Sequence, residues 1–348
     1  MGSLGTFTKG APLSKADISE TGFPFILYGE LYTTYKEVTY HVYRQTDANA
    51  PKECFSNIGD VIIPTSGETP EEIATATCVM VPNVILGGDL NIYRNNAVDG
   101  RIISYIINHK INKCIAKVAQ GKSVVHIKAD DLSKMNIKYP EKDEQAKIIN
   151  FLWLIDKRIE KQRQLVESLK KYKRGLLFSI FTSIQTSVKL EQISTYHSSN
   201  LTLEASQTKG NFALYDANGI CSNIDTYMHD TDYVAIIKDG SGVGKLQYCK
   251  QKSSHIGTLG SLTSQSCSPY YLYTALQIID FTKYITGMAI PHIYYKDYKK
   301  CDIPYPDRNS QNLIENTFKS IDKIITKSIL NLEKLKLLKA GLLQQMFI

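Results

Sequence analysis

Apolar side chains recur at alternating spacings of four and three residues along two stretches of the chain, 141–185 and 307–348. This spacing places them on one face of an α-helix as a heptad seam. A proline stands before each stretch, at Pro140 and Pro306, and indicates a turn from a strand into a helix. The predicted seam residues are Ile148, Leu152, Ile155, Ile159, Val166 and Leu169 in the first helix and Ile314, Phe318, Ile321, Ile325, Leu332 and Leu335 in the second.

Polar residues interrupt both seams at the same two places. They are Gln162 and Lys173 in the first helix and Ser328 and Lys339 in the second. A polar side chain costs less in a packed interface when its partner is polar too, so the shared interruptions suggest that the seams face each other. Two copies related by a two-fold axis run antiparallel, and roughly 37 helical residues make a rod of about 55 Å.

The two helices belong to an internal repeat with an offset of 166 residues. Residues 134–181 align without gaps with 300–347, and the register continues upstream, where GKSVVHI from Gly121 meets GMAIPHI from Gly287. Such self-similarity over a long stretch predicts two copies of one structural unit. The matched pairs include Tyr139/Tyr305, Pro140/Pro306, Gln145/Gln311, Asp156/Asp322, Gly175/Gly341 and Phe181/Phe347.

The segments before the two helices have a different sequence pattern from the helices. They carry β-rich runs, beginning at Gly59, Asp232 and Tyr271, and one short helix each, around Arg101 and Tyr271. We therefore expect an α+β protein with two domains of mixed α/β structure, joined by two long helices packed as an antiparallel coiled coil, in an internal pseudo-two-fold repeat. The expected boundaries are 1–140 for the first domain, 141–185 for the central helix, 186–306 for the second domain and 307–348 for the distal helix.

Composition narrows the class of protein. The 348 residues are 43% hydrophobic and 22% charged, which is ordinary for a globular chain and excludes a disordered one. No apolar run reaches the roughly 18 residues of a membrane span, and the first thirty residues lack a basic start followed by an apolar core, so we expect a cytoplasmic protein with no membrane partner. Seven scattered cysteines without a CxxC spacing argue against disulfides and a thiolate zinc site.

The net charge of +7 permits a nucleic-acid partner. Residues 142–181 carry ten basic and five acidic side chains, and residues 308–348 carry seven and three, so the helices hold +5 and +4 and the rest of the chain holds 7 − 9 = −2. These lysines either solvate the exterior of a coiled coil or contact a partner or phosphates.

Two variable domains, each followed by a long helix that opens with YP, a glutamine and an apolar heptad, resemble the DNA specificity subunit of type I restriction-modification systems. The motifs are YPEKDEQAKIINFLWLIDKRIE from Tyr139 and YPDRNSQNLIENTFKSIDKII from Tyr305, with Ser310 in the second copy where the first has Glu144. The pieces GDVIIPTSG, ILGGDLNIYRNN and AIIKDGSGVGK are also similar to the family's target recognition domains.

The resemblance implies a host-defence protein that binds DNA and catalyses nothing itself. Each domain would read one half of a split target in double-stranded DNA, the helices would set the spacer, and the helical region would dock two adenine methyltransferase subunits. Restriction subunits with helicase and nuclease activity would then join the complex, which methylates DNA. No cofactor and no metal ion are expected for this chain.

Candidate DNA-binding residues are polar side chains in loops and at strand ends, where arginine suits guanine and asparagine suits adenine. Asn95 is equally a turn former. Lys245 follows a glycine turn that lacks the first glycine and the Ser/Thr of a phosphate loop, so the segment is a β-turn or a DNA-facing loop. The candidates are Tyr32, Tyr35, Lys36, Thr65, Ser66, Gly67, Asn91, Arg94 and Asn95 in the first domain and Lys209, Ser241, Lys245, Ser264 and Gln265 in the second.

Catalytic signatures are missing from the sequence. There is no HExxH, no GxSxG and no adenine methyltransferase motif, and the matched His126 and His292 predict structural hydrogen bonds rather than metal binding. Two alternatives stay open at this point. One is a coiled-coil scaffold whose two domains bind proteins, and the other is a self-sufficient nucleic-acid enzyme, which the missing motifs disfavour.

Overall fold

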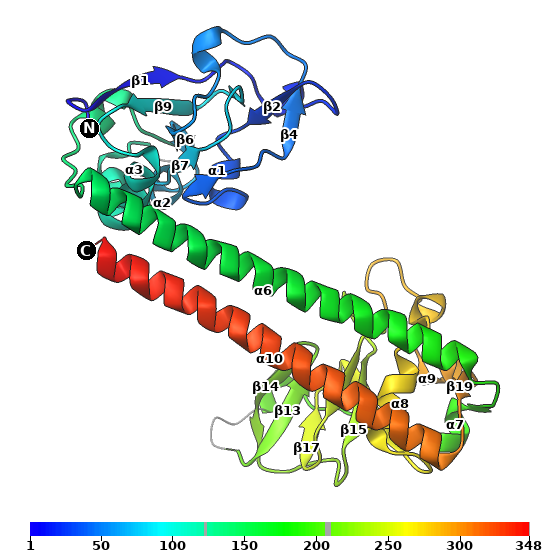
Figure 1. Ribbon diagram of the computed structural model, residues 1–348. Helices are drawn as coiled ribbons and strands as arrows, with labels where there is room; N and C mark the ends of the chain where they lie inside the picture. Colours follow the sequence, from blue (N-terminus) through cyan, green and yellow to red (C-terminus); the bar gives the residue numbers. More distant parts are fainter. Residues whose placement is uncertain (122–123, 206–209, 348) are drawn as a thin grey trace. The chain divides into compact units, whose positions relative to one another are not determined.

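The computed structural model describes residues 1–121, 124–205 and 210–347. The chain forms two compact units (Figure 1). Unit 1 contains Met1–Lys161 and Leu332–Ile348, and unit 2 contains Gln162–Asn331. Each unit therefore holds one mixed-sheet domain together with one part of each long helix, which confirms the α+β fold with two mixed-sheet domains and paired long helices.

Unit 1 contains a five-stranded sheet and a three-stranded sheet. In the first, β1 (Gly5–Lys9), β9 (Leu90–Asn95), β5 (Asp60–Pro64) and β7 (Thr77–Val79) pair antiparallel, and β3 (Val38–Thr39) adds in parallel to β7. In the second, β2 (Phe23–Ile26) lies between antiparallel β4 (Arg44–Thr46) and parallel β8 (Ile85–Leu86). The short pair β6 (Ser66–Gly67) and β10 (Val125–His126) completes the strands of this unit within the described ranges.

Unit 2 has a different sequence and repeats this topology without a counterpart of β3 in its larger sheet. Its larger sheet has the order β12 (Ser194–Ser198), β18 (Leu259–Ser264), β15 (Tyr233–Ile237) and β16 (Leu246–Cys249), all antiparallel. Its smaller sheet places β13 (Phe212–Asp216) between antiparallel β14 (Gly219–Ile224) and parallel β17 (Ser253–His255). A separate pair joins β11 (Ser187–Lys189) to β19 (Asp302–Pro304). The repeat thus extends into the domains, although they do not align residue by residue.

One helix packs against the larger sheet of each domain. In unit 1 it is α3 (Gly100–Ile106), continued by a π-helical turn (Ile107–Ile111) and α4 (Asn112–Val118), and in unit 2 it is α8 (Pro269–Leu276). The β-rich interpretation of the run at Tyr271 is therefore wrong and the helical one is right, because Ser268 caps the helix and Pro269 opens it. The remaining helices have a single turn or little more: α1 (Glu30–Thr33), α2 (Pro70–Ile73), α5 (Ala129–Ser133), α7 (Leu190–Ile193) and α9 (Tyr295–Tyr298), with 3-10 turns at Lys15–Asp17, Lys52–Cys54, Leu203–Ala205 and Phe281–Tyr284.

The long helices are α6 (Lys142–Ser183) and α10 (Arg308–Met346). The start of α10 uses Asp307, whose carboxylate accepts the backbone N–H groups of Asn309 (2.9 Å) and Ser310 (3.1 Å) and the hydroxyl of Ser310 (2.5 Å). The bond from the Ser310 hydroxyl, followed by the backbone bonds, lowers the pKa of the Asp307 carboxyl. Ser310, which departs from the first copy, thus takes part in capping its own helix.

Both domain cores include the long helices. In unit 1, Leu152 of α6 and Leu343 and Phe347 from the C-terminal end of the chain share one apolar cluster with α3. In unit 2, Phe318 of α10 and Leu177 and Phe181 of α6 form the matching cluster with α8. These are equivalent residues of the repeat, so each core is completed by the start of one long helix and the end of the other (Figure 1).

Candidate functional site

The predicted seams lie against each other within each unit. None of the twelve predicted seam residues is exposed, and Leu152, Val166, Phe318 and Leu332 are among the buried ones. In unit 2 the Gln162 amide donates a hydrogen bond to the backbone oxygen of Ser328 (2.9 Å). The first pair of polar interruptions therefore meets, and α6 and α10 run antiparallel in this unit because Lys173, further along α6, contacts Asp322, earlier in α10.

The second pair of interruptions forms two equivalent ion pairs. Lys173 contacts Asp322 at 2.6 Å in unit 2, and Lys339 contacts Asp156 at 2.8 Å in unit 1. Lys173 and Lys339 are matched residues of the repeat, and so are Asp156 and Asp322. The matched aspartates were visible in the sequence as signals of this contact, although they lie outside the predicted seams.

Each ion pair is joined by a tyrosine from the domain helix. Tyr270 of α8 donates its hydroxyl to Asp322 at 2.5 Å, and the ring centre of Tyr105 of α3 lies 5.9 Å from the Nζ of Lys339, the partner of Asp156. Burial and the neighbouring carboxylates raise the pKa of both tyrosines, so they stay protonated donors. Each domain is thereby tied to the polar part of its own helix pair.

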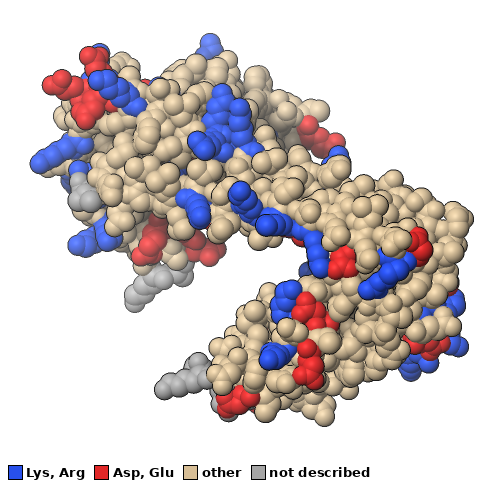
Figure 2. All heavy atoms as spheres, turned by 60° about the horizontal axis from the view of Figure 1, so that its bottom comes forward, with Lys and Arg blue, Asp and Glu red and all other residues tan. Residues whose placement is uncertain are grey.

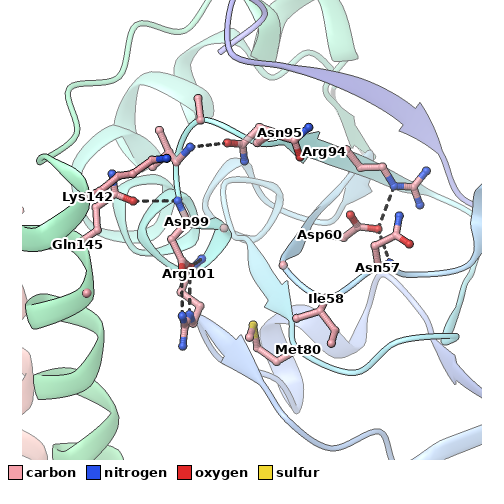
Figure 3. A pocket seen from close by; sticks show the side chains of 16 residues that line it. Asn57, Ile58, Asp60, Met80, Arg94, Asn95, Asp99, Arg101, Lys142 and Gln145 are labelled. Carbon is pink, nitrogen blue, oxygen red and sulfur yellow. Dashed lines mark hydrogen bonds and ion pairs between the residues drawn. The ribbon is translucent and has the colours of Figure 1, made fainter.

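A polar pocket of about 810 Å³ opens in unit 1 where β9 leads into α3 and α6 begins (Figure 3). The Arg94 guanidinium contacts Asp60 at 3.0 Å and donates to the backbone oxygen of Phe55 at 2.8 Å. The Arg101 guanidinium forms a two-pronged contact with Asp99, at 3.0 and 2.8 Å. Both arginines are therefore already held by carboxylates of their own domain.

The pKa values of the two carboxylates in this pocket are shifted in opposite directions. Burial raises the pKa of Asp60, and the bonds from the Asn57 N–H and from Arg94 oppose that rise only in part. Burial also acts on Asp99, but the hydrogen bonds from Arg101 outweigh it and lower the Asp99 pKa.

Gln145 connects the pocket to the long helix. Its side-chain oxygen accepts the backbone N–H of Asp99 at 2.9 Å, and its amide donates to the backbone oxygen of Pro140 at 2.8 Å. The matched Gln311 donates to Pro306 at the same distance. The repeated YP and glutamine thus form one local turn at the start of each long helix.

The remaining candidates of the first domain are spread over several environments. Tyr35 and Asn91 are buried, at 6% and 1% exposure, which leaves neither side chain open to a base in this structure. Thr65 bonds Asp89, the Ser66 hydroxyl lies 3.2 Å from His126 Nδ1, and Gly67 is buried in β6. Tyr32 is half-buried, and Lys36 is exposed.

In the second domain, Ser241 and Lys245 are exposed on the hairpin turn between β15 and β16. Gly240 and Gly244 adopt φ values of 96° and 85° in this turn, which suits glycine. A strand follows rather than a helix, as expected for a segment that is not a phosphate loop. Gln265 is exposed and donates to the Thr195 hydroxyl at 2.6 Å, and Lys209 lies outside the described residues.

Two candidates hold equivalent turns rather than pointing outward. Asn95 ends β9, and its side-chain oxygen accepts the backbone N–H of Val98 at 2.8 Å (Figure 3). Ser264 ends β18, and its hydroxyl accepts the backbone N–H of Cys267 at 3.3 Å. Both turns lead from the sheet into the helix that packs on it, so the turn-forming role of Asn95 is confirmed.

The remaining observations concern the surface charges, the two matched histidines, and possible metal ligands and membrane spans. On the face in Figure 2, Lys and Arg lie among Asp and Glu, and most of the surface is neither. His126 bonds Ser66 as expected, and His292 Nδ1 lies 3.1 Å from the backbone oxygen of Ile290. Within the described ranges, no group of three potential metal ligands comes together. No helix in the same ranges is long and apolar enough to cross a membrane.

Comparison with protein families gives a match over most of the chain. The family model described as "Type I restriction modification DNA specificity domain" matches residues 1–171 and 186–334. The two matches correspond to the two copies of the repeat. No curated protein matches the sequence.

Solved structures with the same fold also cover the whole chain. The S subunit of a type I restriction-modification system from M. genitalium has a TM-score of 0.66 at 17% identity, over 100% of this chain and 94% of that one. A structure described as the basis of complex assembly and conformational transition of the type I R-M system has a TM-score of 0.56 at 15% identity, over 99% and 97%. The HsdS subunit from Thermoanaerobacter tengcongensis has a TM-score of 0.50 at 16% identity, over 99% and 95%.

Proposed function

Because the chain belongs to the type I restriction-modification DNA specificity family, we propose that each of its two domains reads one half of a split DNA target. The protein is the DNA specificity subunit of such a system, the component that selects the sequence and performs no catalysis. Residues 1–140 and 186–306 are proposed as the two target recognition domains, with 141–185 and 307–348 as the helical regions that follow them.

The observation that carries the proposal is the combination of one topology with two different sets of side chains. Both domains have the same order of strands in the smaller sheet and in four strands of the larger sheet, to which the first domain adds β3. Their loops differ, however: the first domain presents Lys36 and Thr65, and the second presents Ser241 and Lys245 on its hairpin turn. Two recognition domains that share a topology but differ in surface chemistry suit a DNA target whose two halves differ in sequence.

The helices are proposed to set the spacer between the two halves and to dock two adenine methyltransferase subunits, which restriction subunits then join. The packed seams and the equivalent ion pairs at Lys173 and Lys339 support a stiff helix pair. Of the alternatives, a protein-binding scaffold lacks the support that the family match gives to DNA recognition.

Exchange of one domain tests the proposal. We expect that replacing residues 1–134 with the corresponding segment of another specificity subunit changes one half of the methylated sequence in cells that carry the full gene set. The other half should stay the same, because residues 186–306 are untouched. Sequencing that detects methylated adenine reads out both halves, and a change in both halves would contradict separate readers.

A further inference from the structure

A short loop recurs at the same place in both domains and is not among the predicted DNA-binding segments. In the second domain the backbone N–H of Thr286 donates to the backbone oxygen of His292 (2.9 Å), and the N–H of His292 donates back to the oxygen of Thr286 (2.8 Å). Gln120 and His126, the equivalent residues of the repeat, make the same two bonds at 3.0 and 2.8 Å. These bonds close two loops, called here the first and the second tip loop, each running from one paired residue to the other.

The second tip loop is attached to the hairpin turn between β15 and β16. Ile293, the next residue along the chain, is buried in the core of unit 2 and donates its backbone N–H to the oxygen of Lys238 at 2.9 Å. The N–H of Gly240 donates to the oxygen of Pro291, inside the loop, at 2.9 Å. Lys238 and Gly240 belong to the hairpin turn on which the DNA-binding candidate Lys245 is exposed. The loop therefore stands beside a turn that is proposed to read DNA.

The first tip loop is attached in the same way. Ile127, which follows it, is buried and donates its backbone N–H to the oxygen of Thr65 at 3.0 Å. The antiparallel pair β10 and β6 sets Ser66 and Gly67 opposite the end of the loop. In both domains, therefore, backbone bonds hold the tip loop against a segment of DNA-binding candidates, and this attachment does not depend on the side chains at the tip.

The tips of the two loops differ in chemistry. Between the paired ends the sequence is GKSVV in the first loop and GMAIP in the second. In the second loop the Met288 side chain is fully exposed and Ile290 is 68% exposed. In the first loop Val124 is 47% exposed, and residues 122–123 lie outside the described residues. The second tip loop thus presents two large apolar side chains to solvent, which marks a contact surface.

Lysines and an exposed tyrosine lie near the second tip loop in the sequence. The Nζ of Lys296 lies 5.2 Å from the ring centre of Tyr294, which is 51% exposed. Among the residues that the structure describes, Lys245 and Lys296 form no ion pair with a carboxylate. The carboxylate of Asp239, in the hairpin turn, is already paired with Lys238 at 2.9 Å. DNA suits this surface, because it offers phosphates to the lysines and base faces to the apolar tip.

The difference between the tips favours DNA over a protein partner. A protein that docked in the same way on both domains would need the same side chains at both loops, yet Met288 is matched by Lys122 in the repeat. Two half-sites of different sequence, in contrast, suit two different tips. Methionine and isoleucine are among the side chains that proteins insert between base steps, where they unstack the bases and kink the duplex.

From these observations we propose that the second tip loop is an apolar wedge, whose Met288 side chain enters the half-site read by the second domain and unstacks one base step there. The inference rests on the proposed function and adds a site of DNA distortion to it. Selection of this half-site then depends on how easily that step deforms, in addition to direct contacts with base edges.

Substitution of the two exposed tip residues tests the wedge. The full chain is assembled with the methyltransferase subunits of its own system, and the complex is titrated with a duplex that carries the motif methylated in cells. 2-Aminopurine, which fluoresces when unstacked, replaces the purines of one half-site in turn. That half-site is the one that stays the same when residues 1–134 are exchanged. The methylated adenine is left in place, because a methyltransferase can itself flip this base.

We expect the unaltered complex to raise the fluorescence at one step. The variant M288S/I290S should give no rise and should bind the duplex at least about tenfold more weakly, because it loses the apolar contact with the bases. The dependence of its affinity on salt should stay the same, since neither side chain contacts a phosphate. The control I220S/M228S removes one isoleucine and one methionine that are 65% and 39% exposed elsewhere in the second domain, and it should behave like the unaltered complex.

The outcomes separate the two proposals. If the unaltered complex does not bind the duplex, the proposed function fails and the wedge fails with it. If that complex binds but no position gains fluorescence, or if M288S/I290S matches it in affinity and fluorescence, only the wedge is overturned. Loss of methyltransferase subunits from M288S/I290S in native mass spectrometry would also overturn it, because the tip would then contact protein. Circular dichroism melts that match the unaltered chain show that the variants fold.

Discussion

Lys339 illustrates how a charged residue is placed inside a helix seam. It is 8% exposed and lies between Asp156 at 2.8 Å and Glu37 at 3.4 Å, while His109 Nε2 lies 2.8 Å from the other oxygen of Glu37. Burial opposes the charge on Glu37, but the hydrogen bond from His109 and the charge of Lys339 outweigh it and lower the Glu37 pKa to about 2. The lysine thus stabilises the charged form of Glu37, which burial disfavours.

We predict that Lys339→Met lowers the free energy of unfolding by about 3 kcal/mol, because it leaves two partly buried carboxylates without their cation. The matched control is Lys336→Met, which removes only the exposed contact with Glu333 and should change the free energy by less than about 0.5 kcal/mol. Urea unfolding followed by circular dichroism measures both. Equal effects of the two substitutions would show that Lys339 is no more important than a surface lysine.

At the scale of elements, three histidines connect the sheets of unit 2. His255 of β17 and His229, just before β15, both lie 2.9 Å from the hydroxyl of Ser261 on β18. His197 of β12 has its ring centre 5.2 Å from that of His229. Burial, followed by the neighbouring His255 and His197, lowers the pKa of His229 to about 4, and burial lowers the pKa of His255 as well.

This cluster predicts acid sensitivity of unit 2. The unfolded chain binds a proton at His229 near pH 6.5 whereas the folded chain binds it only near pH 4, so the unfolding free energy should fall as the pH drops through this window. We expect His229→Gln to reduce the slope of the unfolding free energy against pH. The control His41→Gln replaces an exposed histidine of unit 1 and should leave this slope unchanged. Thermal melts between pH 7 and pH 4 measure the slope. Equal slopes for the unaltered chain and both variants would rule out the histidine cluster as the cause of the acid sensitivity.

For the whole molecule, the proposed ruler function depends on the length of the helix pair. Both helices keep one heptad register, and their matched ion pairs repeat at equivalent positions. A seam of this kind tolerates whole heptads because the apolar face stays continuous.

Inserting one heptad into each of α6 and α10 should therefore lengthen the pair by about 10 Å. DNA rises about 3.4 Å per base pair, so we predict a spacer longer by about three base pairs with both half-sites unaltered. Methylation should also weaken, because three base pairs turn the groove by about a quarter to a third of a helical repeat. The methylated motif in cells is the measurement. Full-strength methylation with the original spacer would mean that the helices do not determine the distance.

The local features of this protein followed from its sequence. The heptad spacing, the repeat and the YP turn predicted the two long helices and their mutual packing, because helical periodicity and proline act over a few residues. The resemblance to the specificity family, confirmed by the family match, came from the same repeated motifs.

The contacts between distant segments were decided only by the tertiary structure. Asn91 and Tyr35 are buried, Ser264 holds a turn, and Lys173 and Lys339 pair with aspartates outside the predicted seams. For Asn95 the structure decides in favour of the turn, one of the two roles that the sequence left open. The structure also shows that two domains without residue-by-residue similarity share the same strand order, apart from β3 at the edge of the first domain's larger sheet. Sheet pairing and side-chain burial depend on residues far apart in the chain, so the alternation of polar and apolar positions specifies a strand but not its neighbours.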